Sequence, residues 1–195
     1  GSFKGFFDLN ASERKELAGT AALMDQMGVD SRDTADSMGF LISSLGLSTT
    51  AAAETSRELV SVANLLKLPP QELVRGFSES RSSLAKHGPG MVVEFKRLAS
   101  AAKALNMDVG DLSSAVGENM DTYEGAAESA GKLNAFLGGP YLNSVELLMM
   151  TESERVMALK DPLDLQGKTF AQMGRYERQG IAKAMNMDAA QLGKF

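Results

Sequence analysis

Nucleophilic and metal-assisted catalysis usually need histidine, cysteine or clustered carboxylates, and this chain offers few of these groups. It has no cysteine and one histidine, His87, which lies in the helix-breaking run His87-Gly88-Pro89-Gly90. The nucleophile motif Gly-x-Ser-x-Gly is absent, and a serine triad would have to use that single histidine. We therefore interpret His87 as a surface loop residue and predict no nucleophilic active site.

Carboxylates are the next candidates for chemistry. Glu118, Asp121, Glu124 and Glu128 would share one face if residues 118–128 formed a continuous helix, as in a carboxylate metal site. Such sites usually add histidines from neighbouring helices, and a single loop histidine does not supply them. We interpret these four residues as a solvated acidic face and predict no metal and no cofactor.

Two carboxylate pairs have the composition of a sugar-cleaving site, namely Glu152/Glu154 and Asp161/Asp164. Both pairs fall at predicted helix ends, where capping already explains them. Gly167-Lys168-Thr169 resembles the end of a phosphate-binding loop, but a proline occupies the position of the first glycine and no strand is predicted before it. We therefore predict no catalytic residues and no enzymatic activity.

Composition favours packed helices over sheets. The chain of 195 residues is 44% hydrophobic, has 12 methionines and 5 prolines, and lacks tryptophan. Its net charge is −5, and no cluster of Lys and Arg suggests a nucleic-acid site. No apolar run approaches the ~18 residues of a membrane span, and no signal peptide opens the chain.

Charge is divided unevenly along the chain. Residues 107–131 hold six carboxylates and no Lys or Arg, whereas residues 167–195 hold five Lys or Arg and two carboxylates. Opposite charges of this kind suit contacts between subunits or between segments of one chain. The alternative is that both are ordinary solvated helix faces.

The predicted helices that carry the candidate residues are joined by a recurring turn. Ala102–Leu112 and Ala182–Leu192 share seven of eleven residues. Asn106 tolerates the left-handed conformation that ends helices, and Asp108 is a good N-cap for the next helix. Met107 lies between them and is placed to pack on the leucine four positions beyond the cap, as a hydrophobic staple. We predict that Met107 and Met187 are buried at helix junctions.

Weaker copies of this turn occur at residues 27–30, 45–48 and 66–69. Apolar residues recur at helical spacing between the turns, and no segment alternates with the period of a strand. The predicted fold is all-α, an array of at least seven short helices without a sheet. We divide it into an N-terminal part, 1–90, and a C-terminal part, 91–195, or read it as one continuous domain. Helices are expected at 10–27, after Asp30, after Ser48, after Pro69 (with Leu73, Phe77 and Leu84), at 91–105, after Asp108, at 122–137, at 143–150, from Thr151 to Asp161-Pro162, and at 170–185.

Both ends of the chain suggest a fragment. Phe3, Phe6 and Phe7 have little polar cover, and we interpret them as a docking segment. Gly1-Ser2 is typical of a cloning scar, and the sequence stops a few residues into its last predicted helix. We expect the native chain to extend in both directions.

From about Leu105 to its end, the chain resembles the tape measure proteins of tailed bacteriophages, especially those of large, long-tailed phages. The N-terminal half shares only the helical style and the repeated turn. The residues that carry the resemblance are Gly117–Glu128, Ala130–Gly139, Leu147–Arg155 and Phe170–Met185.

The resemblance implies a structural virion protein with no chemistry of its own. Such a protein is made in the host cytoplasm, lies as several parallel copies in the tail lumen, sets tail length during assembly and leaves ahead of the DNA at infection. It implies a homo-oligomer, trimeric or larger, that contacts tail tube and baseplate proteins.

The frequent caps and glycine breaks indicate a folded module of a larger tape measure protein, because no long heptad run supports a rod. Even a fully helical chain of this length would span only about 290 Å. Two alternatives remain open: a helical partner-binding or adaptor domain of other origin, and a tail-associated peptidoglycan hydrolase.

Overall fold

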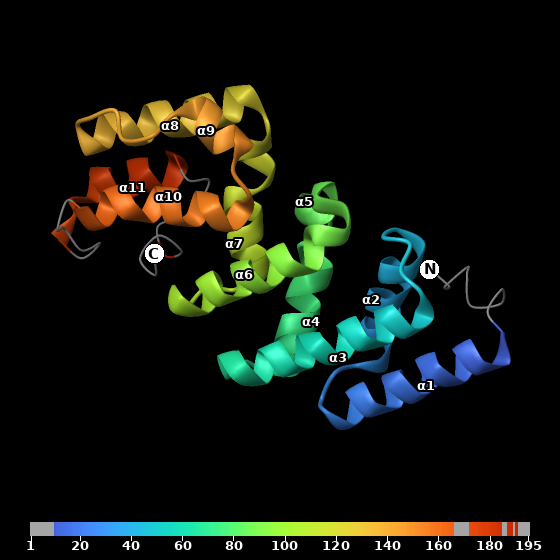
Figure 1. The fold of residues 1–195 in the computed structure, drawn as a ribbon. Coiled ribbons are helices and arrows are strands. Elements are labelled where there is room, and N and C mark those ends of the chain that lie inside the picture. The colour runs from blue at the N-terminus through green and yellow to red at the C-terminus, as the bar shows by residue number, and fades with distance from the viewer. Residues whose placement is uncertain (1–9, 166–171, 185–186, 189, 191–195) are drawn as a thin grey trace. The chain divides into compact units, whose positions relative to one another are not determined.

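The computed structural model describes residues 10–165, 172–184, 187–188 and 190. Every regular element in these ranges is a helix, and none of the described residues lies in a strand (Figure 1). The prediction of an all-α fold with at least seven helices is therefore confirmed for the described part of the chain. Within it, no helix combines the length and apolar character needed to cross a lipid bilayer.

Contacts between residues divide the chain into two compact units, Gly1–Lys96 and Arg97–Phe195. The division falls inside helix α6, a few residues beyond the boundary drawn between residues 90 and 91 from the sequence. That sequence-based domain division stays a prediction. The N-terminal unit contains α1 (Ala11–Gln26), α2 (Ser31–Ser43), α3 (Thr49–Leu66), α4 (Pro70–Glu79), α5 (Arg81–Leu84), the 3₁₀ segment η2 (Ala85–Gly90) and the start of α6 (Met91–Ala104).

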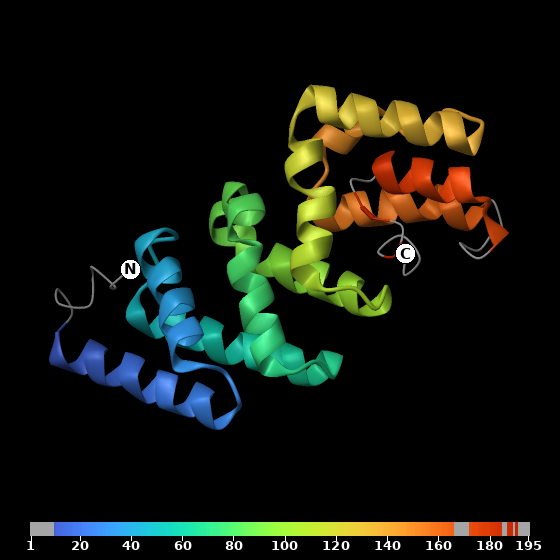
Figure 2. The same cartoon turned by 180° about the vertical axis from the view of Figure 1, so that it is seen from behind.

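Helices α1, α2, α3 and α4 pack against one another in the N-terminal unit, and α1 and α3 lie side by side in both Figure 1 and Figure 2. The rings of Phe40 and Phe95 each meet the buried ring of Phe77 edge to face, with centroid distances of 6.4 and 5.1 Å. The side chain of Gln71 accepts a hydrogen bond from the backbone N–H of Asp30 at 2.7 Å, which ties α4 to the start of α2. An aromatic core and a polar tie thus hold these helices together.

The C-terminal unit is built around α8, which packs against α9, α11 and η3, while α7 packs against α10 and η3. Phe136 of α8 lies directly over Gly180 of α11, because a Cβ atom at Gly180 would come within 1.9 Å of the phenylalanine ring. The close approach of these two helices therefore depends on a residue without a side chain. The elements of this unit after α6 are α7 (Val109–Val116), η3 (Glu118–Asp121), α8 (Tyr123–Leu137), α9 (Ser144–Met149), α10 (Glu152–Leu165) and α11 (Arg175–Ala184).

The repeated turn is a Schellman motif followed at once by an N-cap. At the end of α6, the N–H of Asn106 donates to the carbonyl of Lys103 at 3.1 Å, and the N–H of Met107 donates to the carbonyl of Ala102 at 2.9 Å. Asn106 has a φ of 53°, which confirms the left-handed conformation expected of it. The carboxylate of Asp108 then caps α7.

The predicted burial of the junction methionines is confirmed, since Met107 is 9% exposed and Met187 is 6% exposed. Leu112 is also fully buried, whereas Leu192, the expected partner of Met187, lies outside the described residues. The upstream copies of the turn also place a left-handed residue before an apolar residue and an N-cap. They are Gly28-Val29-Asp30, Gly46-Leu47-Ser48 and Lys67-Leu68-Pro69.

Most predicted helix starts are confirmed, including the capping boxes Asn10/Glu13 and Thr151/Glu154. The helix after Pro69 was expected to reach Leu84, but α4 ends at Glu79 and α5 begins at Arg81. The hydroxyl of Ser83 donates to the carbonyl of Ser80 at 3.1 Å, so a side chain competes for backbone hydrogen bonding at this break.

The prediction that Asp161-Pro162 ends a helix is wrong, because α10 continues to Leu165. Proline inside a helix loses one hydrogen bond and crowds the carbonyl four residues earlier, at a cost of about 3 kcal/mol or more. Pro162 is buried, as are Val156 and Leu159 on the same helix. Packing of this face offsets the local cost.

The last long helix begins later than predicted. Its expected start, Phe170, lies outside the described residues, but residues 172–174 do not continue an α-helix and α11 begins at Arg175. The carboxylate of Glu177 accepts a hydrogen bond from the N–H of Gly174 at 2.7 Å, and the carbonyl of Gly174 accepts one from Arg178 at 3.0 Å. A glycine N-cap with a reciprocating glutamate therefore sets the start of α11.

Candidate functional site

The carboxylate pair considered for sugar chemistry is split between two environments. Glu152 is fully buried. The carboxylate of Glu154 accepts a hydrogen bond from the backbone N–H of Thr151 at 2.8 Å, as expected of a helix cap. Of the second pair, Asp161 is exposed, whereas the side chain of Asp164 lies outside the described residues.

The acidic residues between 118 and 128 do not share a helix face, because η3 and the extended residue Thr122 interrupt the helix. Asp121 pairs with Arg155 at 2.8 Å, and Glu128 pairs with Lys132. Among the described residues, no group of three or more His, Cys, Asp or Glu is placed to hold a metal ion. His87 is half-buried in η2, and the Gly167-Lys168-Thr169 segment lies outside the described residues.

Arg155, on α10, is 1% exposed and bonds several partners within the C-terminal unit. Its Nε donates to the carbonyl of Leu147 at 2.8 Å, and one terminal nitrogen donates to the carbonyl of Val116 at 2.9 Å. The same nitrogen bonds the carboxylate of Asp121, and the other terminal nitrogen donates to Leu148 at 3.3 Å. A cation near the carboxyl ends of α7 and α9 is favourable for both helices.

Our sequence analysis missed this role, although a signal was present. Glu152, Arg155, Val156 and Leu159 stand at i, i+3, i+4 and i+7, which is the spacing of a buried helix face. All four are buried. A charged residue at a position of the apolar stripe is therefore the signal that would have identified Arg155.

A groove of about 270 Å³ runs between the start of α9 and the second half of α10. Two exposed carboxylates, Glu146 and Asp161, contribute to its lining. Pro162 also lines it and has no N–H to offer the carbonyl of Ala158, another lining residue. The groove therefore combines apolar walls with acceptors for a cationic donor. Its lining residues are Tyr141, Leu142, Asn143, Glu146, Leu147, Met150, Ala158, Asp161 and Pro162.

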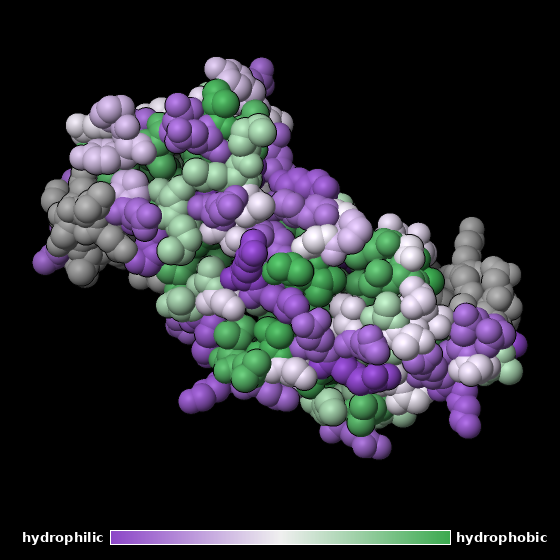
Figure 3. All heavy atoms as spheres, in the orientation of Figure 1, coloured by the Kyte–Doolittle hydropathy of each residue, from purple (hydrophilic) through white to green (hydrophobic). Residues whose placement is uncertain are grey.

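Exposed hydrophobic side chains also lie on the chain segments that line the groove. Val145 and Met149 are four residues apart on α9 and therefore lie on one face of that helix, whereas Tyr141 precedes the helix in a loop. The exposed fractions of Tyr141, Val145 and Met149 are 49, 54 and 79%, and Met157 on α10 is 55% exposed. On the face drawn in Figure 3, hydrophobic patches of this kind lie between hydrophilic side chains. We refer to the groove together with Tyr141, Val145, Met149 and Met157 as the α9–α10 surface.

Comparisons of the chain with protein-family models, with curated proteins and with solved structures found no match.

Proposed function

We propose that the chain is a folded, protein-binding segment of a phage tail tape measure protein, which acts in tail assembly, tail-length determination and genome ejection. The observation that carries this proposal is the α9–α10 surface. Part of it, namely Leu147, Met149 and Met150, lies in the sequence block Leu147–Arg155 that resembles tape measure proteins, and its other residues lie shortly before or after that block.

The chemistry of this surface supports protein binding. Met149 and Val145 are exposed on a short helix whose other side is buried through Leu147. Exposed apolar patches with a polar rim are typical of protein interaction sites. In this proposal the segment lies in the tail lumen and contacts other copies of itself and tail tube or baseplate proteins.

The proposal is tested in the phage whose genome encodes the chain. Mass spectrometry of purified tails should detect peptides from both units of the chain. An in-frame deletion of the coding region should give missing, shortened or non-ejecting tails by electron microscopy and infection assays. Tails that lack these peptides, together with normal assembly of the deletion phage, would contradict the proposal.

A helical adaptor of other origin is the second candidate, since the same α9–α10 surface would suit any protein partner. The tail experiment separates the two, because an adaptor would bind its partner without being part of the virion.

The hydrolase alternative has its own test. Because Glu152 is buried and Glu154 caps α10, we expect no release of peptidoglycan fragments by the purified chain. Release that is lost in Glu152→Gln or Glu154→Gln variants that still fold would overturn the structural role.

A further inference from the structure

We propose that the α9–α10 surface of one copy binds the exposed face of α11 of a second copy, in a head-to-tail contact. The inference deepens the proposed function, on which it rests for the presence of several copies of the chain in one assembly. It names the two surfaces that meet and the geometry of their contact.

The occupant of the groove is defined by its chemistry. Glu146 and Asp161 bring two negative charges to an otherwise largely apolar lining, so the groove favours an apolar or aromatic side chain next to a cation. The two carboxylates disfavour nucleic acid and anionic lipid, since both ligands are negatively charged.

The chain carries a surface of this chemistry on α11. Arg175, Tyr176, Gln179 and Lys183 are exposed, and Tyr176 is 84% exposed. At 100° per residue these four positions fall within about a third of the helix circumference. We call them the α11 face; it offers one aromatic ring between two cations.

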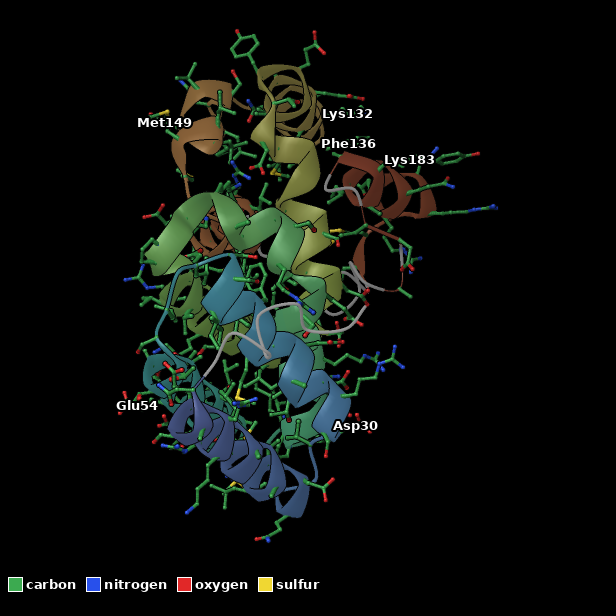
Figure 4. All side chains as sticks on the ribbon, turned by 90° about the vertical axis from the view of Figure 1, so that its right-hand side faces the viewer. Asp30, Glu54, Lys132, Phe136, Met149 and Lys183 are labelled. Atoms are coloured by element: carbon green, nitrogen blue, oxygen red, sulfur yellow. The ribbon has the colours of Figure 1, made fainter. Side chains whose placement is uncertain are left out.

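The two surfaces belong to one unit but lie on different sides of it. In Figure 4, Met149 of α9 and Lys183 of α11 stand on opposite sides of the C-terminal unit, with Lys132 and Phe136 of α8 between them. The part of the α9–α10 surface that Met149 marks therefore meets the α11 face only between copies. Such a contact is heterologous, and it propagates into a ring or an open chain of copies.

The expected strength of one contact is modest. A standard interface buries about 800 Å² on each partner, and one short groove with one helix face is at the low end of that scale. We expect dissociation constants on the order of micromolar for one contact, weakened by salt because the charges lie at the surface.

The heterologous geometry is tested with two variants of the full chain that each damage one surface. The groove variant is Glu146→Lys/Asp161→Lys, which repels the α11 face. The α11 variant is Arg175→Ala/Tyr176→Ala, which removes the ring and one of the two cations of the α11 face. The control is Arg14→Ala/Tyr123→Ala, which removes one exposed cation and one exposed tyrosine elsewhere. Circular dichroism verifies that all three remain helical.

Sedimentation velocity over a micromolar concentration series gives the readout. The parent chain and the control should form oligomers beyond the dimer, and each damaged variant should sediment as a monomer. An equimolar mixture of the two damaged variants should form a 1:1 dimer that does not grow, because one intact groove and one intact α11 face remain in the pair.

A parent chain that stays monomeric, a damaged variant that associates like the parent, or a mixture without a dimer would each overturn the head-to-tail contact. Detection of the chain in purified tails would leave the proposed function standing in each case. Absence of the chain from tails, together with the expected heterodimer, would instead reject the tail role and retain the contact.

Discussion

Phe77 and Arg155 have similar positions in the two units, since each is almost fully buried and joins several helices. Phe77 does so with its ring, which meets Phe40 of α2 and Phe95 of α6 edge to face. Arg155 does so with its guanidinium group, which bonds carbonyls of α7 and α9 and the carboxylate of Asp121. Phe77 thus joins its helices by apolar contact, and Arg155 joins its helices by directed hydrogen bonds.

The two units also differ in their exposed aromatic side chains. Among the described residues, every exposed aromatic side chain belongs to the C-terminal unit. A buried guanidinium group requires polar atoms around it, so the ends of α7 and α9 that face Arg155 present carbonyls and Asp121 to it. Burial of a charged group is therefore compatible with aromatic side chains at the surface, where a partner can bind them, while exposed aliphatic and methionine side chains occur in both units. The exposed aromatic residues are Tyr123, Phe136, Tyr141 and Tyr176.

The largest effect is expected on removing the buried cation. Arg155→Ala removes the hydrogen bonds that Arg155 donates to Asp121 and to the carbonyls of Val116 and Leu147, and it should cost about 3–5 kcal/mol of unfolding free energy. Hydrogen exchange with mass spectrometry should show lost protection in α7, α9 and α10 and little change in α2–α4. The control Arg75→Ala breaks an exposed ion pair and should cost about 1 kcal/mol or less. Equal protection of α9 in parent and Arg155→Ala would contradict the role of the guanidinium group.

The next largest loss of stability is expected at equivalent helix junctions of the two units. Met107→Asp places a carboxylate in a buried site and should cost about 2–4 kcal/mol. Leu68→Asp, at the matching junction of the N-terminal unit, should cost less because Leu68 is only half-buried. Urea unfolding monitored by circular dichroism measures both, with the exposed Lys103→Ala as control. A Met107→Asp variant with the stability of its parent would contradict the assignment of this methionine as a buried hydrophobic staple.

A smaller effect is expected in the aromatic core. Phe77→Leu keeps an apolar side chain but loses two edge-to-face contacts and some volume, so it should cost about 1–3 kcal/mol. Hydrogen exchange should show the loss in α2, α4 and the start of α6, with α9 unchanged. If α9 lost as much protection from hydrogen exchange as α4, the stability of one unit would depend on the core of the other.

The smallest effect concerns two left-handed residues in the two units. Lys67 and Asn106 have φ values of 54° and 53°, but asparagine tolerates this conformation better than lysine. Lys67→Gly should therefore raise the unfolding free energy by about 0.5–1 kcal/mol, and Asn106→Gly should raise it less. Urea denaturation, analysed with one m-value for the parent and both variants, measures the two changes in unfolding free energy. A larger gain at Asn106 than at Lys67 would reverse this ranking.

Much of the helix order was predictable because capping acts over a few residues. Asn10, Asp30, Ser48 and Asp108 each accept a hydrogen bond from the first turn of the following helix, as their types and spacing predict. No candidate active site followed from the sequence, and the α9–α10 surface did not either. Its lining comes from a loop and two helices, and no local pattern relates Tyr141 to Pro162.

Local sequence determined where most helices of this protein begin and end, because the residues that compete at a helix terminus are neighbours in the chain. Tertiary structure alone decided which groups Arg155 binds and that Pro162 lies inside a helix. Arg155 binds a carbonyl 39 positions earlier in the chain. Burial of Pro162 among distant residues offsets a local cost that by itself would favour ending the helix. Both outcomes depend on contacts that form only when the helices pack.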